Sequence, residues 1–182
     1  ALHSILSQSQ YQHMSGTRMA MDFVETPSHL MEHFCWETSV LKLLAPDMPD
    51  ELILQLQQSR FEFAALDRQN QILYSLMDQQ LFGKPATSSM HHMELWGALH
   101  AQTHVPYLKG THWFSKFGHL VSYGAGYYSY LYCQVFSNRI WNHTIKNRTS
   151  REAGTALWQK LLKYGGARDP NLMLKDLLGD DV

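Results

Sequence analysis

The sequence predicts an all-α protein. Hydrophobic residues recur three and four positions apart along most of the chain, a spacing that places them on one face of a helix. Signals for β-strands are nearly absent, so no sheet is expected. With 182 residues, of which 45% are hydrophobic and 17% charged, the chain can bury a sizeable core.

The first half of the chain divides into helical stretches separated by proline, glycine and turn residues. The longest stretch covers residues 51–82, where Asp50 is expected to act as the cap. Its hydrophobic pattern does not keep a heptad, so two helices or one kinked helix are expected. In order, we expect a helix end at about 1–10, a loop at 11–18, a segment at 19–23 that could be extended, a helix to about Leu44, the stretch 51–82, and a helix from Ser88 or Ser89 to about Gln102.

The second half begins with an irregular aromatic segment and continues as helices. Thr149 and Glu152 have the spacing of a capping box, which predicts a helix that ends at Gly165. Asp169 and Pro170 are typical of the start of a final short helix. The expected elements are the irregular segment 104–118, a glycine-containing turn near 124–126, a helix to about Asn142, a helix from about 150 to 165, and a helix that Gly179 closes.

Composition excludes several classes of function. The formal net charge is −1, from 15 basic and 16 acidic residues, so nothing indicates a nucleic-acid or anionic-membrane partner. No apolar run is long enough to span a bilayer. Cys35 and Cys133 are too few and too far apart for a disulfide framework or a zinc knuckle, which favours a reducing compartment.

Glu25 lies near the start of a helix whose apolar residues include Leu30 and Phe34. A carboxylate among apolar residues is costly unless it is paired or holds a metal. Two helix starts compete: Asp22 with Glu25 reads as a capping box, and Thr26 followed by a proline reads as a later start. From spacing alone, a capping role for Glu25 is favoured, because capping carboxylates are common.

Histidine and tyrosine side chains provide the other candidate sites. His29 and His33 are four residues apart and could share a helix face, but a surface pair is favoured because no carboxylate-bracketed motif surrounds them. His119, Tyr123, Tyr127 and Tyr130 surround a glycine-containing turn, and such groups can donate to a developing oxyanion. Tyrosines at this spacing also occur in an aromatic core helix, which is favoured from spacing alone.

Four segments carry a family resemblance. They are Ala1-Leu2-His3-Ser4 with the following Ser15-Gly16-Thr17, the stretch Asp22-Phe23-Val24-Glu25, the stretch from Leu120 to Tyr130, and Gly165-Gly166-Ala167-Arg168-Asp169-Pro170. Together they resemble the thimet oligopeptidase family of zinc metallopeptidases, and most of all its mitochondrial members. The resemblance covers essentially the whole chain and is strongest in residues 1–37 and 117–132.

The resemblance implies a fold, a location and a chemistry. Residues 1–182 would form the C-terminal portion of one helical peptidase catalytic domain. The enzyme would use one zinc ion to hydrolyse short peptides or the presequence remnants of imported precursors. Its expected location is the mitochondrial matrix, with the cytoplasm as the alternative.

The resemblance also assigns roles to residues. Glu25 would be the third zinc ligand. His119, Tyr123 and Tyr130 would stabilise the tetrahedral intermediate, although thimet oligopeptidase itself has one more residue in the loop that holds Tyr123. The remaining candidates, which would face the substrate, are Tyr127, Gly124 and Gly126.

One departure limits what this chain can do by itself. The family's His-Glu-x-x-His helix supplies two zinc ligands and the catalytic glutamate, and it would stand immediately before Ala1. The isolated chain is therefore expected to hold zinc weakly and to be inactive, with the missing N-terminal catalytic portion as its partner. Two alternatives stay open: a non-catalytic scaffold or binding subunit derived from the peptidase fold, and an enzyme whose missing part is a separate chain.

Overall fold

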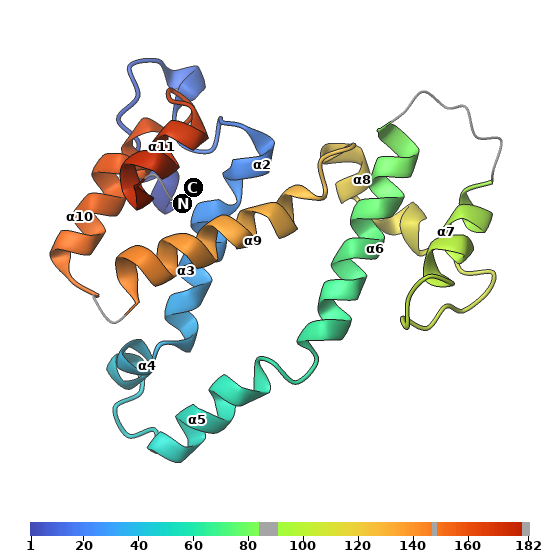
Figure 1. Ribbon diagram of the computed structural model, residues 1–182, viewed down its shortest axis with the longest axis horizontal. Helices are drawn as coiled ribbons and strands as arrows, with labels where there is room; N and C mark the ends of the chain where they lie inside the picture. Colours follow the sequence, from blue (N-terminus) through green and yellow to red (C-terminus); the bar gives the residue numbers. More distant parts are fainter. Residues whose placement is uncertain (84–90, 147–148, 180–182) are drawn as a thin grey trace. The chain divides into compact units, whose positions relative to one another are not determined.

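Residues 1–83, 91–146 and 149–179 are described by a computed structural model (Figure 1). Every regular element in these ranges is helical, and no strand occurs within them, which confirms the all-α prediction. The chain divides into two compact units. Unit 1 combines residues 1–44 with the described residues from 129 onward, and unit 2 comprises residues 45–128.

Unit 1 is built from the two ends of the described chain (Figure 1). Its first part contains five short helices before α4. The elements are α1 (Leu2–Leu6), the 3₁₀ helix η1 (Gln12–Met14), α2 (Met21–Val24), α3 (Thr26–Glu32), the 3₁₀ helix η2 (His33–Trp36), α4 (Thr38–Leu44), α9 (Ser129–Ile140), the π-helical turn η4 (Trp141–Ile145), α10 (Arg151–Lys160), the 3₁₀ helix η5 (Leu162–Tyr164) and α11 (Pro170–Leu178).

Side-chain caps explain where the last two α-helices begin. The Oγ atom of Ser150 accepts a hydrogen bond from the backbone N–H of Ala153 at 3.2 Å. A carboxylate oxygen of Asp169 accepts from the N–H of Asn171 at 2.7 Å, and Pro170 occupies the first turn, as predicted. Gly179 ends α11 at φ 85°, a left-handed conformation that favours glycine.

The core of unit 1 joins its two sequence halves. Phe23 and Leu30 from the first half are each 1% exposed and belong to one hydrophobic cluster with Ile140 and Met173 from the second half. The indole N–H of Trp158 donates to the carbonyl oxygen of Leu6 at 3.0 Å, which fastens α10 to the end of α1. Burial of such large apolar side chains is the main stabilising contribution to this unit.

Glycines allow the 11–18 loop to lie directly against the segment that follows η5. The N–H of Gly166 donates to the carbonyl oxygen of Met14 at 2.8 Å. A Cβ atom on Gly165, whose φ is 55°, would overlap that same carbonyl group. Two segments that carry the sequence resemblance, around Gly16 and around Gly165, are therefore packing partners in unit 1.

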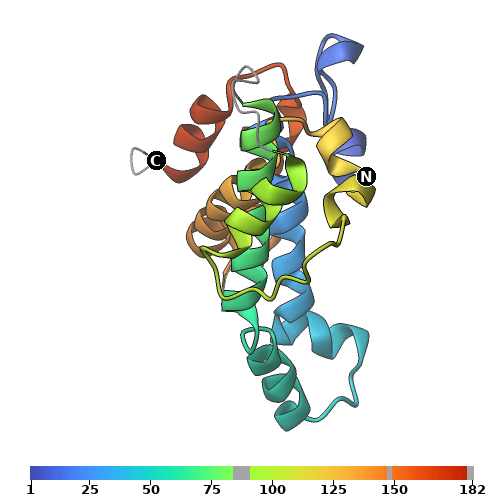
Figure 2. The same cartoon turned by 90° about the vertical axis from the view of Figure 1, so that its right-hand side faces the viewer.

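Unit 2 contains the long helices of the middle of the chain (Figure 2). Helix α7 packs beside α6, and the core between them contains Leu73, Met77, Trp96 and Leu99. Trp113 stacks on Tyr74 at 4.3 Å between ring centroids, which closes this core with the irregular segment. The elements are α5 (Asp50–Ser59), α6 (Ala64–Phe82), α7 (His92–His100), the 3₁₀ helix η3 (Trp113–Lys116) and α8 (His119–Ser122).

The stretch 51–82 forms two helices with a break at residues 60–63. This confirms the first of the two predicted alternatives, two helices rather than one kinked helix. Asp50 is not the cap of α5: Pro49 occupies that position without a side-chain hydrogen bond, and Asp50 lies in the first turn. Ser88 and Ser89, expected to begin the next helix, lie outside the described residues. Helix α7 begins at His92, and the ring of His91 caps it by accepting from the N–H of Met93.

Three other local predictions are wrong. Residues 21–24 form helix α2 rather than an extended segment. The helix expected to run to Leu44 is interrupted, because the backbone at Glu37 is extended, although no proline or glycine stands there. The cap of α10 is Ser150, one residue after Thr149.

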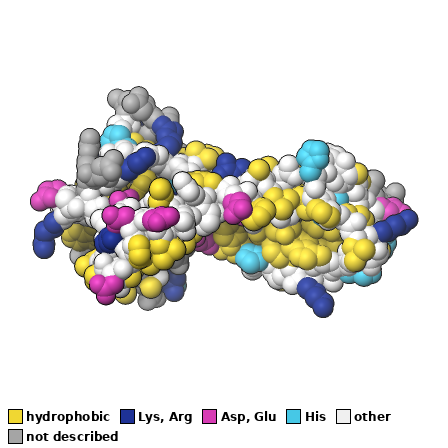
Figure 3. Space-filling model, turned by 90° about the horizontal axis from the view of Figure 1, so that it is seen from below, with side chains coloured by type: hydrophobic (Ala, Val, Ile, Leu, Met, Phe, Trp, Pro, Cys, Tyr) yellow, Lys and Arg dark blue, Asp and Glu magenta, His cyan; other side chains and the backbone are white. Residues whose placement is uncertain are grey.

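Large apolar side chains are exposed along α5, α6 and the turn between them, and Figure 3 shows hydrophobic side chains gathered on one face. Such gathering is typical of a surface that contacts other protein. The exposed residues of these elements are Leu52, Leu54, Leu56, Phe61, Phe63, Leu66, Ile72, Leu76 and Phe82. None of the described helices has the length and apolar character needed to cross a bilayer.

Candidate functional site

Glu25 stands at the joint between α2 and α3. It is the C-cap position of the first helix and the N-cap position of the second, where its backbone is helical (φ −88°, ψ −2°). Helix α3 starts at Thr26 with Pro27 in its first turn, so the later of the two predicted starts is confirmed. The half-buried Glu25 side chain makes no capping hydrogen bond to this helix.

Ser28 orients the Glu25 carboxylate. Its Oγ atom lies 2.7 Å from Oε2 of Glu25 and 2.8 Å from the Glu25 carbonyl oxygen, so the hydroxyl can donate to either. A hydrogen bond to a charged acceptor restricts the carboxylate to few rotamers. The Glu25 carboxylate is therefore oriented by a side chain of α3 and is not used as the cap of that helix.

Helix α9 packs against both α2 and α3, and this contact brings Tyr130 to the same part of unit 1 as Glu25. The thiol of Cys133, one turn beyond Tyr130, donates to the carbonyl oxygen of Asp22 at 3.1 Å. Burial raises the pKa of that thiol, and the negative charges of Glu25 and Asp22 add to the effect. Because residues three apart share a helix face, Tyr130 lies on the side of α9 that faces the α2–α3 joint.

The Tyr130 ring also contacts α3. It meets the ring of His29 edge to face, with 6.3 Å between centroids. Nδ1 of His29 lies 3.6 Å from a carboxylate oxygen of Glu32, so this histidine is directed toward its own helix. His33 stacks on Trp141 at 4.9 Å, and thus His29 and His33 have different neighbours rather than forming one pair.

Several buried side-chain polar atoms of unit 1 have no hydrogen-bond partner among the described residues, and those of His3 and Ser129 are among them. Both ring nitrogens of His3, which is 5% exposed, and Oγ of Ser129, which is fully buried, are in this position. Burial lowers the pKa of His3, so its neutral form is favoured. Buried polar atoms without partners are rare in folded proteins.

The other sequence-predicted residues belong to unit 2 and lie together at the start of α8 and in the turn that follows α8. The ring of His119 is 5.6 Å from that of Tyr123 and 5.7 Å from that of Tyr127. His119 is exposed and Tyr123 is half-buried, so both can reach a ligand. Tyr127 is 6% exposed, and its hydroxyl donates to Oε1 of Gln71 at 3.1 Å.

The glycines of this turn flank a residue in an unusual conformation. Ala125, between Gly124 and Gly126, has φ 60°, a region that residues with a side chain rarely adopt. A Cβ atom on Gly124 would meet ordinary contacts 3.6 Å from the Leu120 carbonyl oxygen. Gly124 is exposed and Gly126 is buried, so of these two glycines only Gly124 presents its backbone to solvent.

The candidate residues therefore form two groups, each within its own unit. Glu25 and Tyr130 lie on packed helices of unit 1. The groups of unit 2 are His119, Tyr123, Tyr127, Gly124 and Gly126.

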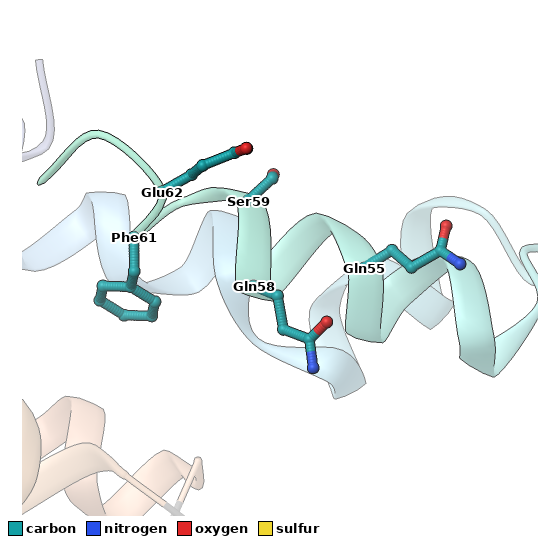
Figure 4. Close-up of a pocket in the computed structure, with 5 residues that line it drawn as sticks. All are labelled: Gln55, Gln58, Ser59, Phe61 and Glu62. Atoms are coloured by element: carbon teal, nitrogen blue, oxygen red, sulfur yellow. The ribbon is translucent and has the colours of Figure 1, made fainter.

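No set of three His, Cys, Asp or Glu side chains suited to a metal occurs among the described residues. A hollow of about 550 Å³ lies at the end of α5 (Figure 4). Its polar side chains point in different directions instead of converging on one point, which does not favour a catalytic site there. The residues that line it are Gln55, Gln58, Ser59, Phe61 and Glu62. Within the described residues, Glu25 therefore belongs to no set of three side chains that could hold a metal.

Comparison with known proteins decides the family. The profile of Peptidase family M3 matches residues 1–182. The chain belongs to peptidase family M3. This family is generally zinc-dependent, and membership confirms the resemblance noted in the sequence.

Curated relatives of this M3 chain include several mitochondrial enzymes. The mitochondrial intermediate peptidase of Arabidopsis thaliana is 42% identical over 190 residues, which cover 100% of this chain and 27% of that protein. The mitochondrial intermediate peptidase of Neurospora crassa is 38% identical, covering 100% of this chain and 24% of that protein. Mitochondrial intermediate peptidase 1 of Cryptococcus neoformans is 38% identical, and the match covers 98% of this chain and 27% of that protein. The chain spans about a quarter of the length of these relatives.

Sequence reasoning missed the residues that hold the candidates in place. Ser28 lies within the Glu25 stretch, and its three-residue spacing from Glu25 was a usable signal. Asp78 and Gln79 of α6 bind the turn around Ala125 from 47 and 46 residues away. No local pattern could indicate that long-range pairing.

Proposed function

We propose that this chain supplies part of the active site of a zinc-dependent metalloendopeptidase that acts on peptides in mitochondria. The observation that carries the proposal is an oriented, non-capping carboxylate at Glu25, on helices that pack against the helix of Tyr130, in a chain of family M3. The relatives named mitochondrial intermediate peptidases support a mitochondrial location, and the matrix is the compartment that we propose. Membership of a peptidase family supports peptides as the substrate class, and we propose that presequence remnants are among them.

Glu25 would hold the metal through one carboxylate oxygen. This fits the structure, because Ser28 fixes Oε2 and the group is only half-buried. Zinc, when bound, would polarise the scissile carbonyl and activate a water molecule. The remaining ligands and the general base would come from outside the described residues, and the isolated chain would bind zinc weakly.

Tyrosine hydroxyl groups and a histidine imidazole would donate hydrogen bonds to the oxyanion that forms as the peptide bond is attacked. Tyr130, at the start of α9, would donate from unit 1, and His119 and Tyr123 are the donors proposed in unit 2. Tyr127 already donates its hydroxyl to Gln71, so its contribution to substrate binding would come through its ring or backbone. Gly124 would let backbone approach the substrate, whereas the buried Gly126 would contribute through the conformation of the turn.

The test is Tyr130→Phe in the full chain that carries this sequence. Loss of an oxyanion donor typically lowers turnover about 100- to 1,000-fold. The Michaelis constant should change little, because the ground-state carbonyl uses the donor weakly. Zinc content should be unchanged. A variant within about threefold of wild-type turnover would assign Tyr130 to the aromatic packing of α9 and remove it from the site.

A further inference from the structure

Asp78 is a buried carboxylate within a long helix. It is 0% exposed, and it lies in the last third of α6. Among the described residues it makes no ion pair with a lysine, arginine or histidine. A buried carboxylate without a cation must have its oxygens satisfied by hydrogen bonds.

Its partners are two backbone amides of the tyrosine-rich turn. The N–H of Ala125 donates to Oδ1 at 2.9 Å, and the N–H of Tyr127 donates to Oδ2 at 2.9 Å. The neighbouring Gln79 donates from Nε2 to the Ala125 carbonyl oxygen at 2.6 Å. Ala125, the residue with φ 60°, is thereby held at both its N–H and its C=O by consecutive residues of α6.

Helix α6 presents these anchors on one face. Gln71, Asp78 and Gln79 are seven and eight positions apart, which corresponds to two turns of helix. Gln71 accepts from the hydroxyl of Tyr127, so the same face binds the backbone and a side chain of the turn. The contacts all lie within unit 2.

The anchored residues in turn fix the functional candidates. The N–H of Gly126, between the two anchored residues, donates to the Tyr123 carbonyl oxygen at 2.6 Å. The N–H of Tyr123 donates to the His119 carbonyl oxygen at 2.7 Å. Hydrogen bonds and the short backbone segment between them therefore connect Asp78 to the backbone of Tyr123 and His119, the two oxyanion donors proposed in unit 2.

We propose that Asp78 is a positioning residue that holds the turn at residues 123–127 in the conformation that catalysis requires, with Gln79 as its second anchor. The proposal rests on the proposed function, because the turn matters for turnover only if His119 and Tyr123 act on the substrate. Asp78 itself touches neither of their side chains in the described contacts and acts through the backbone.

Asp78→Asn is the sharpest change. The amide keeps the shape of the carboxylate but has one acceptor oxygen and one N–H₂ donor, so one of the two backbone N–H groups would face a donor. Hydrogen exchange measured by mass spectrometry on the full chain should show the Ala125 or Tyr127 amide exchanging about 10-fold faster or more. The amides of α6 should keep wild-type protection. Exchange of both turn amides within about twofold of wild type would overturn the anchor.

Kinetics tests the positioning. Displacing a catalytic group by about 1 Å lowers rates by about 100-fold, so turnover of Asp78→Asn should fall about 10- to 100-fold with the Michaelis constant within about threefold. Two control variants on the same helix separate this from general damage. Asp67→Asn changes an exposed carboxylate and should match wild type. Leu73→Ala empties part of the buried core and should lower the melting temperature while each folded molecule keeps its turnover.

The outcomes separate this proposal from the proposed function. Faster exchange with unchanged turnover would refute the positioning role, since the turn would then not matter for the reaction. A wild-type full chain that has normal zinc content but does not hydrolyse peptides would refute the proposed function, while hydrogen exchange would still decide whether Asp78 anchors the turn. If Asp78→Asn does not fold, Gln79→Met removes the second anchor without burying a new polar group. For Gln79→Met we expect faster exchange of the turn amides and lower turnover, both smaller in size than for Asp78→Asn. Exchange and turnover equal to those of the wild type would overturn the proposal.

Discussion

Replacing Glu25 by glutamine separates a structural role from a metal-binding role. The side chain keeps its shape and can still accept a hydrogen bond from Ser28, but the charge is lost. A hydrogen bond to a charged acceptor contributes about 1.5–3 kcal/mol and a neutral one about 0.5–1.5 kcal/mol. With the 2.7 Å contact retained at a half-buried site, the loss of stability should be on the order of 1 kcal/mol or less.

The effect on metal binding should be far larger than the effect on stability. If Glu25 is a ligand, the full chain should lose most of its zinc and its peptide hydrolysis together, since a catalytic site has few protein ligands. Zinc content per chain, measured after equilibration with buffered free zinc, is the primary assay. Turnover and thermal unfolding on the same samples complete it.

Ser28→Ala is the matched variant, because it leaves the carboxylate and removes only the hydroxyl that orients it. Loss of such a supporting group typically weakens metal affinity about 10- to 100-fold. Zinc binding should therefore decrease in the order wild type, Ser28→Ala, Glu25→Gln. A Glu25→Gln enzyme with full zinc content and wild-type turnover would refute the ligand assignment.

Two further predictions concern packing and thiol reactivity in unit 1. Gly165→Ala should destabilise the protein by about 2 kcal/mol or more, because its backbone is left-handed and because the new Cβ atom would overlap Met14. Gly154→Ala, inside α10 with open space around it, should stabilise the protein by about 0.5–1 kcal/mol. Equal melting temperatures for the two variants would contradict the described packing of Gly165. Alkylation at neutral pH followed by peptide mapping should label the exposed Cys35 in the folded protein and Cys133 only after unfolding, because burial raises the pKa of the Cys133 thiol. Equal labelling of both cysteines would show that α9 is not packed on α2 as described.

The sequence was sufficient for the fold class and for those helix ends that local chemistry decides. Pro27, Asp169 and Gly179 have the roles that their residue types predict. The helix break at Glu37 was not predictable in this way, because nothing in the residue itself favours an extended backbone. Tertiary packing decides such positions, and a single sequence does not reveal it.

For the candidate site, the sequence identified side chains but not their supports. Glu25 and Tyr130 came from a family resemblance, whereas local spacing alone favoured a cap and a core tyrosine. The structure adds that Glu25 makes no capping bond and that Ser28 holds it. The anchoring role of Asp78 could not be predicted, because an acidic residue inside a long helix normally indicates a solvated face. Its hydrogen-bond partners also lie 47 and 49 residues away in the sequence.

The division of unit 1 between two distant parts of the chain has a consequence for synthesis on the ribosome. The bond from Trp158 to Leu6 spans 152 residues, and the one from Cys133 to Asp22 spans 111. At about 5–20 residues per second, the first helices wait on the order of ten seconds for their partners to emerge. Unit 2, whose contacts are contained in one continuous stretch, can fold during that interval. The apolar faces of α2 and α3 then stay open to chaperones until α9 leaves the exit tunnel.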